Sequence, residues 1–288
     1  MRVALLHNAS AGSEDHTDEE LVRMIDRAGH EVVHVVSRVS DLTEALQSAP
    51  CDMVAVAGGD GTVGRAACEL SEWRLPIAIL PLGTANNTAR TLSLPARLKK
   101  LIQSWQGATQ RPFDVGSLDD GSVRQLFSEA AGWGVFARTI ADAKKRTEHK
   151  SRARQLHRDR KLFRASLERT RPRFYEIEVD GRDCSGEYLL VEVMNVPLLG
   201  PRLELSPTSD PGDGTLELVL AGESERAMLD ELARTGSSPE QLRCERGSAL
   251  CVRCDDELAH RDGKLLRYAP GHHDFSIRLR RGAITYLR

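Results

Sequence analysis

The order of apolar segments changes near residue 111, and this change constrains the fold more than any other feature of the sequence. Before it, short apolar runs alternate with segments of helical spacing. The predicted strands are 2–8, 30–37, 51–59 and 75–84, and the predicted helices are 18–29, 40–49, 62–73 and 95–106. Strands joined by helices pair in parallel and are covered on both faces. The first part therefore predicts an α/β domain with a parallel sheet.

After residue 111, strands follow strands. Several of these segments alternate apolar and polar residues, and Gly, Asp or Pro separates them, which is typical of an antiparallel sheet or sandwich. Two helical segments interrupt the series, at 138–170 and 223–236. We expect two domains, an α/β domain at 1–111 and a mainly antiparallel β-sandwich domain at 112–288. The place of the last strand is left open, and a return to the first domain is one alternative.

Composition excludes several protein classes. The chain has 288 residues, 40% of them hydrophobic, and no apolar run approaches the ~20 residues that cross a bilayer. Its six cysteines are irregularly spaced, which does not indicate a disulfide scaffold. The first apolar segment is too short for a secretory signal. We expect a cytoplasmic protein.

A glycine-rich loop follows the third predicted strand. It reads Gly58-Gly59-Asp60-Gly61-Thr62 and precedes a predicted helix. The first N–H groups of a helix lack intrahelical acceptors, and glycine lets the backbone approach a phosphate closely. Asp60 would repel a phosphate, so it suits Mg²⁺ binding or acceptance of a proton from an attacking hydroxyl. The loop therefore predicts a phosphate-binding turn.

Two other predicted strands end in small polar residues. The fourth is followed by Gly83, Thr84, Asn86 and Asn87, and the first by the turn 7–12. Open parallel sheets bind ligands outside the carboxyl ends of their strands, so three such ends favour a nucleotide site. The alternative is that these are ordinary strand-to-helix turns, which also favour Gly, Asn and Ser.

The segments 58–62 and 81–87 resemble the GGDGT and P-x-G-T-x-N-D motifs of the diacylglycerol kinase catalytic domain family. That family includes YegS-like bacterial lipid kinases and sphingosine kinases. The turn 8–12 is similar to its N-P-x-[SA]-G turn, without the proline. Later matches extend the resemblance over nearly the whole chain, at 128–134, 195–220 and 260–264. The fold implied is a parallel-sheet domain like that of diacylglycerol and NAD kinases, followed by a β-sandwich.

The resemblance implies an ATP-dependent lipid kinase that transfers the γ-phosphate to a hydroxyl of diacylglycerol or a related lipid, with the head group entering between the domains. The implied cofactors are ATP and Mg²⁺. Asp60 and Asp262 are the implied catalytic carboxylates. The implied nucleotide-binding residues are Asn8, Ser37, Gly58, Gly59, Asp60, Gly61, Thr62, Gly83, Thr84 and Asn86. A structural metal is implied at Asp210, Asp213 and Thr215.

Three positions depart from the family pattern. Arg65, Asn87 and Lys264 stand where the family has acidic residues. A catalytically degenerate protein that binds nucleotide or lipid is therefore an alternative. A NAD kinase-like enzyme is a further one, because those enzymes also use a GGDG loop, although segment 81–87 argues against it.

A strongly basic stretch lies within the second domain. Between Arg138 and Arg173 there are fourteen Lys/Arg and four Asp/Glu, a net charge of +10. One interpretation is peripheral contact with an anionic membrane that carries the lipid substrate. The other is a solvated helix whose thin apolar stripe packs on the sandwich. No stacking aromatics interleave with the charges, so no nucleic-acid partner is expected. A homodimer is left open.

Overall fold

A computed structural model describes residues 1–8, 16–143, 151–237 and 242–288. The chain divides into two compact units. The first comprises Met1–Phe113, Gly282–Arg288 and a short segment that ends at Arg152. The second contains the remainder, from Asp114 to Arg281. No helix among the described residues is long and apolar enough to cross a membrane.

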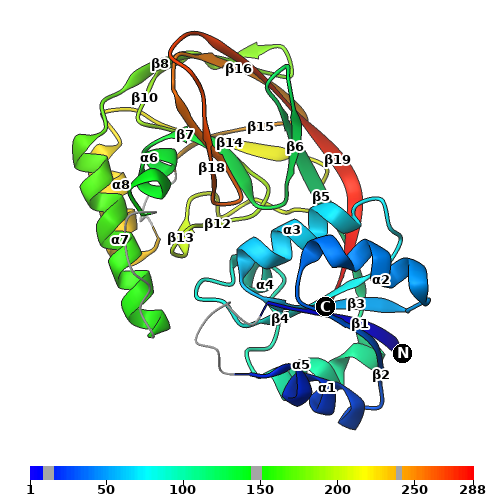
Figure 1. Cartoon of the computed structure of the whole chain (residues 1–288). Coiled ribbons are helices and arrows are strands. Elements are labelled where there is room, and N and C mark those ends of the chain that lie inside the picture. Colours follow the sequence, from blue (N-terminus) through cyan, green and yellow to red (C-terminus); the bar gives the residue numbers. More distant parts are fainter. Residues whose placement is uncertain (9–15, 144–150, 238–241) are drawn as a thin grey trace. The chain divides into compact units, whose positions relative to one another are not determined.

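The first unit is built on a parallel sheet with the order β4-β3-β1-β2 (Figure 1). Its strands are β1 (Arg2–His7), β2 (Glu31–Val36), β3 (Met53–Gly58) and β4 (Ile77–Pro81). Every residue of β3 is buried, as expected for a central strand covered on both faces. The predicted α/β domain is confirmed.

Helices cover both faces of this sheet (Figure 1). The helices are α1 (Asp18–Arg27), η1 (Val39–Asp41), α2 (Leu42–Ser48), α3 (Asp60–Leu70), α4 (Asn87–Thr91), α5 (Leu98–Ser104) and η2 (Trp105–Gly107). On one face, α1 and α5 bury Leu21, Ile25 and Leu101 against Val3 and Leu5 of β1. The helix α1 begins with a capping box between Thr17 and Glu20, which satisfies two of its free N–H groups.

The second unit contains two sheets that pack face to face, as the sandwich prediction requires. One contains β10 (Gly186–Tyr188), β8 (Arg173–Val179), β16 (Ala249–Cys254) and β19 (His273–Leu287), with β9 (Arg182–Asp183), β5 (Gln110–Asp119) and β6 (Arg124–Phe127) attached. The other is antiparallel, in the order β15 (Arg243–Gly247), β14 (Leu216–Ala221), β11 (Leu190–Met194), β7 (Ala130–Gly134), β17 (Leu258–Arg261) and β18 (Lys264–Arg267). A short ribbon joins β12 (Leu198–Leu199) to β13 (Leu203–Glu204).

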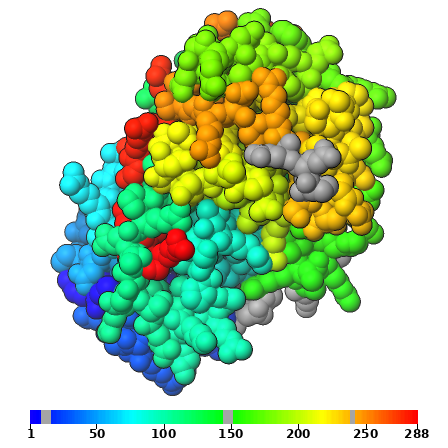
Figure 2. Space-filling view, turned by 180° about the vertical axis from the view of Figure 1, so that it is seen from behind, coloured from blue at the N-terminus to red at the C-terminus, as the bar shows by residue number. Residues whose placement is uncertain are grey.

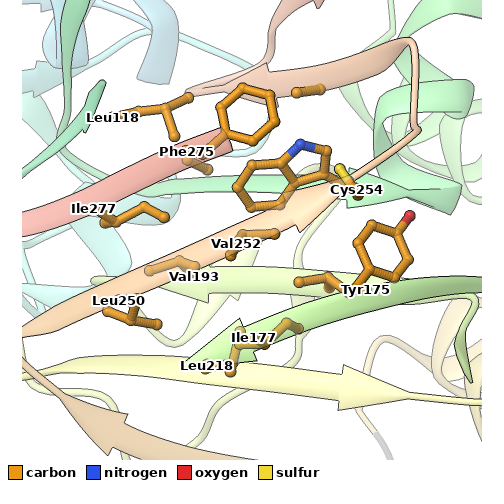
Figure 3. Close-up of a cluster of buried hydrophobic side chains, with 14 of the residues drawn as sticks. Leu118, Tyr175, Ile177, Val193, Leu218, Leu250, Val252, Cys254, Phe275 and Ile277 are labelled. Carbon is orange, nitrogen blue, oxygen red and sulfur yellow. The ribbon is translucent and has the colours of Figure 1, made fainter. Parts of the chain in front are cut away.

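The core of the sandwich lies between these two sheets (Figure 3). Strand β8 shows how the sequence builds it, because Tyr175, Ile177 and Val179 are buried while the residues between them are exposed. Val193 and Leu218 approach from the opposite sheet (Figure 3). The alternation of apolar and polar residues therefore arises because one face of the strand packs in the core and the other faces solvent.

Three helices cover the outer face of the second sheet: α6 (Val135–Ala143), α7 (Arg152–Arg169) and α8 (Arg226–Thr235). The apolar stripe of α7 includes Phe163 and Leu167, which pack in one cluster with Leu190 and Leu229. The basic residues of α7 are exposed or half-buried. Part of the basic stretch, residues 144–150, lies outside the described residues.

The long strand β19 belongs to both units. Its first half, His273–Arg278, pairs with β16, and Tyr286 near its end pairs in parallel with Ile77 of β4. The last residue, Arg288, exchanges two backbone hydrogen bonds with Thr109, at 2.8 and 2.9 Å. From behind, the red C-terminal atoms lie among the teal atoms of the first unit (Figure 2). The chain end therefore extends the parallel sheet.

Candidate functional site

The glycine loops after β3 and β4 touch backbone to backbone. The carbonyl of Gly58 accepts hydrogen bonds from the N–H groups of Leu82, at 3.0 Å, and Gly83, at 3.3 Å. A Cβ placed on Gly83 would lie 2.4 Å from the Cα of Gly59, and one on Gly59 would lie 3.2 Å from the Cα of Gly83. No side chain larger than hydrogen fits Gly83 without displacing main chain. The contact between these turns explains why both carry glycine.

The helix α3 begins at the end of the first loop. Gly59 is its N-cap, with an extended backbone and no side-chain cap, and its carbonyl accepts from the amides of Thr62 and Val63. A Cβ on Gly61 would meet nothing within 4 Å. The first turn of a helix presents N–H groups and the positive end of the helix dipole. With open space beside Gly61, this turn fits an anion such as a polyphosphate chain.

Asp60 connects the two loops. One carboxylate oxygen accepts a hydrogen bond from the backbone N–H of Thr88, at 3.2 Å, in the first turn of α4. The N-cap of α4 is Asn86, which has a left-handed backbone (φ 54°) and whose amide donates to the carbonyls of Pro81 and Gly83. Asp60 therefore performs the capping that Asn86 does not. The predicted catalytic carboxylate is fixed beside both turns.

The end of β1 also reaches the glycine loop. The amide of the Asn8 side chain donates to the Thr62 hydroxyl at 2.9 Å, and its backbone N–H donates to the carbonyl of Ala57. The rest of the predicted turn, residues 9–12, lies outside the described residues. Thr84 is half-buried in the second loop. Ser37 is exposed after β2, which β1 separates from β3, and no hydrogen bond among the described residues joins it to the loops.

In the second unit, Asp262 lies in the tight turn between β17 and β18. Its φ is 43° and that of Gly263 is 70°, as a two-residue hairpin turn requires. Its carboxylate accepts from the backbone N–H groups of Ser128, Glu129 and Ala130, at 2.8 to 3.2 Å, and from the Ser128 hydroxyl at 3.3 Å. Burial raises the pKa of Asp262, and the three backbone donors oppose that shift.

A chain of hydrogen bonds continues from this turn to the DG turn at residues 213–214. The amide of Asn195 donates to the carbonyls of Ser128, at 2.8 Å, and Asp114, at 2.9 Å. The Asp114 carboxylate then accepts from the N–H of Gly214 at 2.9 Å. Asp114 and Asn195 are almost fully buried. Asp114 was not predicted from the sequence, although it is a single carboxylate within the apolar strand segment RPFDVGS.

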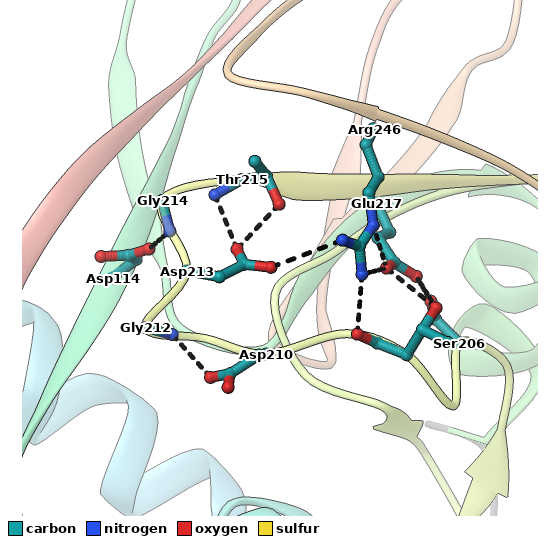
Figure 4. A network of polar contacts seen from close by, with 10 residues as sticks. Asp114, Ser206, Asp210, Gly212, Asp213, Gly214, Thr215, Glu217 and Arg246 are labelled. Carbon is teal, nitrogen blue, oxygen red and sulfur yellow. Dashed lines mark hydrogen bonds and ion pairs between the residues drawn. The ribbon is translucent and has the colours of Figure 1, made fainter.

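The residues of the implied metal site fold into turns (Figure 4). The carboxylate of Asp210 accepts from the N–H of Gly212, and one oxygen of Asp213 accepts from the N–H and hydroxyl of Thr215. The other oxygen of Asp213 lies 3.8 Å from the guanidinium of Arg246. A divalent cation needs several oxygen ligands, and this guanidinium would repel one. The arrangement as it stands does not fit a bound Mg²⁺, so the metal site stays a prediction.

Arg246 itself is exposed and joins a polar cluster in which Ser206 and Glu217 are buried (Figure 4). It donates twice to the Glu217 carboxylate, at 2.6 and 2.8 Å, and to the carbonyl of Thr208. The hydroxyls of Ser206 and Thr208 also donate to Glu217, which is 1% exposed. A buried carboxylate is tolerated only when paired in this way. Within the described residues, no group of three or more His, Cys, Asp or Glu could hold a metal.

The three departures from the family pattern differ in their surroundings. Arg65 is exposed on α3, where its side chain donates to the carbonyl of Gly61 at 3.0 Å. Asn87 is buried at the start of α4, and Lys264 is exposed on β18. None of the three disturbs the contact between the two glycine loops.

Both units match known protein families. Residues 2–118 match the diacylglycerol kinase catalytic domain, and residues 134–279 match the YegS C-terminal NAD kinase β-sandwich-like domain. The second match alone spans half of the chain.

Curated relatives agree with these matches. The chain is 27% identical to a protein named diacylglycerol kinase from Bacillus subtilis strain 168, covering 82% of this chain and 78% of that protein. It is 29% identical to a Pseudomonas aeruginosa protein named "Probable lipid kinase YegS-like", covering 92% and 89%. A crystal structure described as a diacylglycerol kinase from Bacillus anthracis has the same fold, with a TM-score of 0.72, 19% identity and coverage of 99% and 96%.

Proposed function

Since the chain belongs to the diacylglycerol kinase family that includes the YegS-like lipid kinases, we propose that it is an ATP-dependent lipid kinase. The acceptor in this proposal is a hydroxyl of diacylglycerol or a related lipid. One observation supports it most strongly: Gly59 and Gly83 bring two strand ends into backbone contact, and Asp60 bridges them to Thr88. Such a cradle is suited to the phosphates of a nucleotide.

The proposed nucleotide site uses backbone groups more than side chains. The amides at the start of α3 bind the phosphates, and the open space beside Gly61 leaves room for them. The absence of Cβ atoms at Gly59 and Gly83 lets the two loops approach each other. Asn8 holds the Thr62 side chain in place through its amide. Mg²⁺, when bound with ATP, would neutralise charge on the phosphates. The protein's own contribution is positioning and electrostatic stabilisation, which dominate phosphoryl transfer.

We assign acceptance of the hydroxyl proton to Asp60. As the lipid oxygen bonds to the γ-phosphorus, the bond from that phosphorus to the β-phosphate oxygen breaks and ADP leaves. The proton of the attacking hydroxyl passes to a carboxylate, a contribution of about 10²–10⁴-fold. Asp60 is half-exposed at the loops. Asp262 already accepts four hydrogen bonds, the number of lone-pair sites on a carboxylate, and its catalytic role stays a prediction.

The second candidate function is a nucleotide- and lipid-binding protein without transfer activity. Arg65, Asn87 and Lys264 favour it, because each replaces an acidic residue of the family pattern. Asp60 favours activity, because its carboxylate is retained beside both glycine loops, although its hydrogen bond to Thr88 also gives it a structural role.

The test is a transfer assay with purified full-length protein. Labelled ATP and Mg²⁺ are supplied with micelles of diacylglycerol, ceramide or sphingosine, and NAD is tested separately. We expect label in at least one lipid and none in NAD. Bound ATP without transfer to any lipid would overturn the kinase proposal in favour of a binding protein. Transfer to NAD would mean that the acceptor is a nucleotide and not a lipid. Asp60→Asn serves as the inactive control.

A further inference from the structure

Arg65 is the one basic residue of α3, and it lies a helical turn after Gly61. Its side chain is exposed, and its Nε donates to the carbonyl of Gly61 at 3.0 Å. Long side chains on a helix point toward its N-terminus, so the guanidinium reaches back to the first turn. A Cβ on Gly61 would meet nothing within 4 Å, so the space beside that turn is open. The cation is therefore held beside the turn that fits an anion.

Arg23 on α1 makes the same bond at the same helix position, but in a different charge environment. It is also the sixth residue of its helix, and it donates to the carbonyl of the second residue, Glu19, at 2.9 Å. The first turn of α1 carries three acidic residues, which offset this cation. The first turn of α3 carries Asp60 alone. The bond to the helix carbonyl is therefore ordinary, and the surroundings of Arg65 are what distinguish it.

The charges around the first turn of α3 are not balanced by the protein. In the part of the chain that the structure describes, no carboxylate forms an ion pair with Arg65. The carboxylate of Asp60 accepts a hydrogen bond from the N–H of Thr88 on the next helix. A cation beside the first turn of a helix is unfavourable, because the positive end of the helix dipole lies there. An anion bound beside Gly61 would offset both the dipole and the guanidinium charge.

We propose that Arg65 binds the terminal phosphates of ATP, together with the backbone amides at the start of α3. This role rests on the proposed function, because the kinase site supplies the anion. Nε of Arg65 is bonded to Gly61, so the two terminal nitrogens of the guanidinium are the donors to the phosphate oxygens. Arginine carries its charge at every working pH, and its planar donors match a phosphate group. Arg65 thus adds a side-chain cation to a site otherwise built from backbone groups.

The test is calorimetric titration of the full chain with ATP and Mg²⁺, without lipid. Arg65→Gln should weaken ATP binding by about tenfold or more, the effect of one lost charge-assisted hydrogen bond. The nucleotide-free variant should unfold at the wild-type temperature or above it, since a cation is removed from the positive end of a helix. The matched control is Arg23→Gln, which removes the same charge and the same bond from the same position of α1. It should bind ATP within about twofold of the wild type.

Two further variants test the sign of the charge. Arg65→Lys keeps a cation and should bind ATP within about fivefold of the wild type, whereas Arg65→Glu should weaken binding more than Arg65→Gln does. Wild-type affinity of Arg65→Gln, an equal loss in Arg23→Gln, or tighter binding by Arg65→Glu would each overturn the proposal.

The binding measurements also separate this proposal from the kinase proposal. ATP binding by the wild type without transfer to lipid would contradict the kinase proposal alone, because the affinities of the Arg65 variants require no chemistry. A wild-type protein that does not bind ATP would overturn both proposals.

Discussion

Gly83 lies so close to Gly59 that a Cβ on Gly83 would come within 2.4 Å of the Gly59 Cα. Two turns that follow different strands of one sheet are thereby held in main-chain contact. The same Cβ would also lie 2.8 Å from a side-chain oxygen of Asn86. The geometry of the proposed nucleotide site depends on this contact, since it fixes the spacing of the backbone amides.

Gly83→Ala should separate the two turns. The obstacle is main chain rather than a flexible side chain, so we expect a loss of about 1–3 kcal/mol in the free energy of unfolding, with weakened ATP binding. Urea unfolding and calorimetric titration with ATP measure the two effects. The control is Gly61→Ala, whose Cβ meets nothing within 4 Å and which should leave stability unchanged or raised. Equal stability of the two variants would contradict the proposed role of the contact.

Substitutions of Asp60 should separate capping from chemistry. Asp60→Ala removes the acceptor for the Thr88 N–H and should cost about 0.5–2 kcal/mol of stability, together with activity. Asp60→Asn keeps an oxygen acceptor but removes the charge. We expect wild-type stability and a loss of about 10²–10⁴-fold in kcat for this variant. Full activity of Asp60→Asn would show that the carboxylate does not accept the proton.

Asp262→Asn should destabilise the second unit. Asparagine tolerates the left-handed backbone of this turn, so the substitution tests the carboxylate alone. Its NH₂ group would face N–H donors that now reach an oxygen, and we expect a loss of about 1–3 kcal/mol. Thermal or urea unfolding measures it. Unchanged stability would mean that the bonds to Ser128, Glu129 and Ala130 contribute little.

Glu192 gives a prediction for the pH dependence of stability. Its carboxylate and His260 are fully buried, with Nε2 of His260 3.0 Å from both oxygens, and a Cβ on Gly132 would lie 2.3 Å from one of them. Burial raises the pKa of Glu192, and His260 opposes that shift. A carboxyl group with a raised pKa stabilises the folded state when the pH is below its unfolded-state pKa. This contribution is lost as the pH rises through its folded-state pKa.

Glu192→Gln removes this titration. Relative to the wild type, the variant should therefore become more stable as pH rises from about 4 to about 8. Urea unfolding of both proteins across this range gives the difference, in which titrating groups that do not contact this pair cancel. A difference that is constant with pH would contradict the raised pKa.

Periodicity predicted the α/β unit because β3 is a continuous apolar run and its neighbours alternate with helices. The sandwich followed from strands such as β8, whose polar residues face solvent. The hairpin of β17 and β18 was not predicted, because its strands of four residues carry little pattern. Most of the fold could be predicted from local sequence patterns. Short strands that pair with partners distant in the chain could not.

The same distinction between local and distant partners applies to the residues of the candidate site. The glycine loops were found because the residues that are proposed to bind nucleotide lie together in sequence, at 58–62 and 83–86. Asp114 was missed because its partners, Asn195 and Gly214, are distant in the chain. Glu192 and His260 were missed for another reason: helices cover the outer face of their sheet, so a polar residue within a strand is buried on a face that alternation assigns to solvent. Only the three-dimensional packing reveals such pairs.

Amide hydrogen exchange in the presence of Mg²⁺ and ATP tests the central claim most directly, because it reports on the backbone groups that are proposed to bind the phosphates. The account predicts that exchange at Gly59–Gly61 and at Thr84 slows by about tenfold or more when nucleotide is added. Asp60→Asn should show the same protection without transfer. Unchanged exchange at both loops under saturating nucleotide, with protection elsewhere in the chain, would contradict the account.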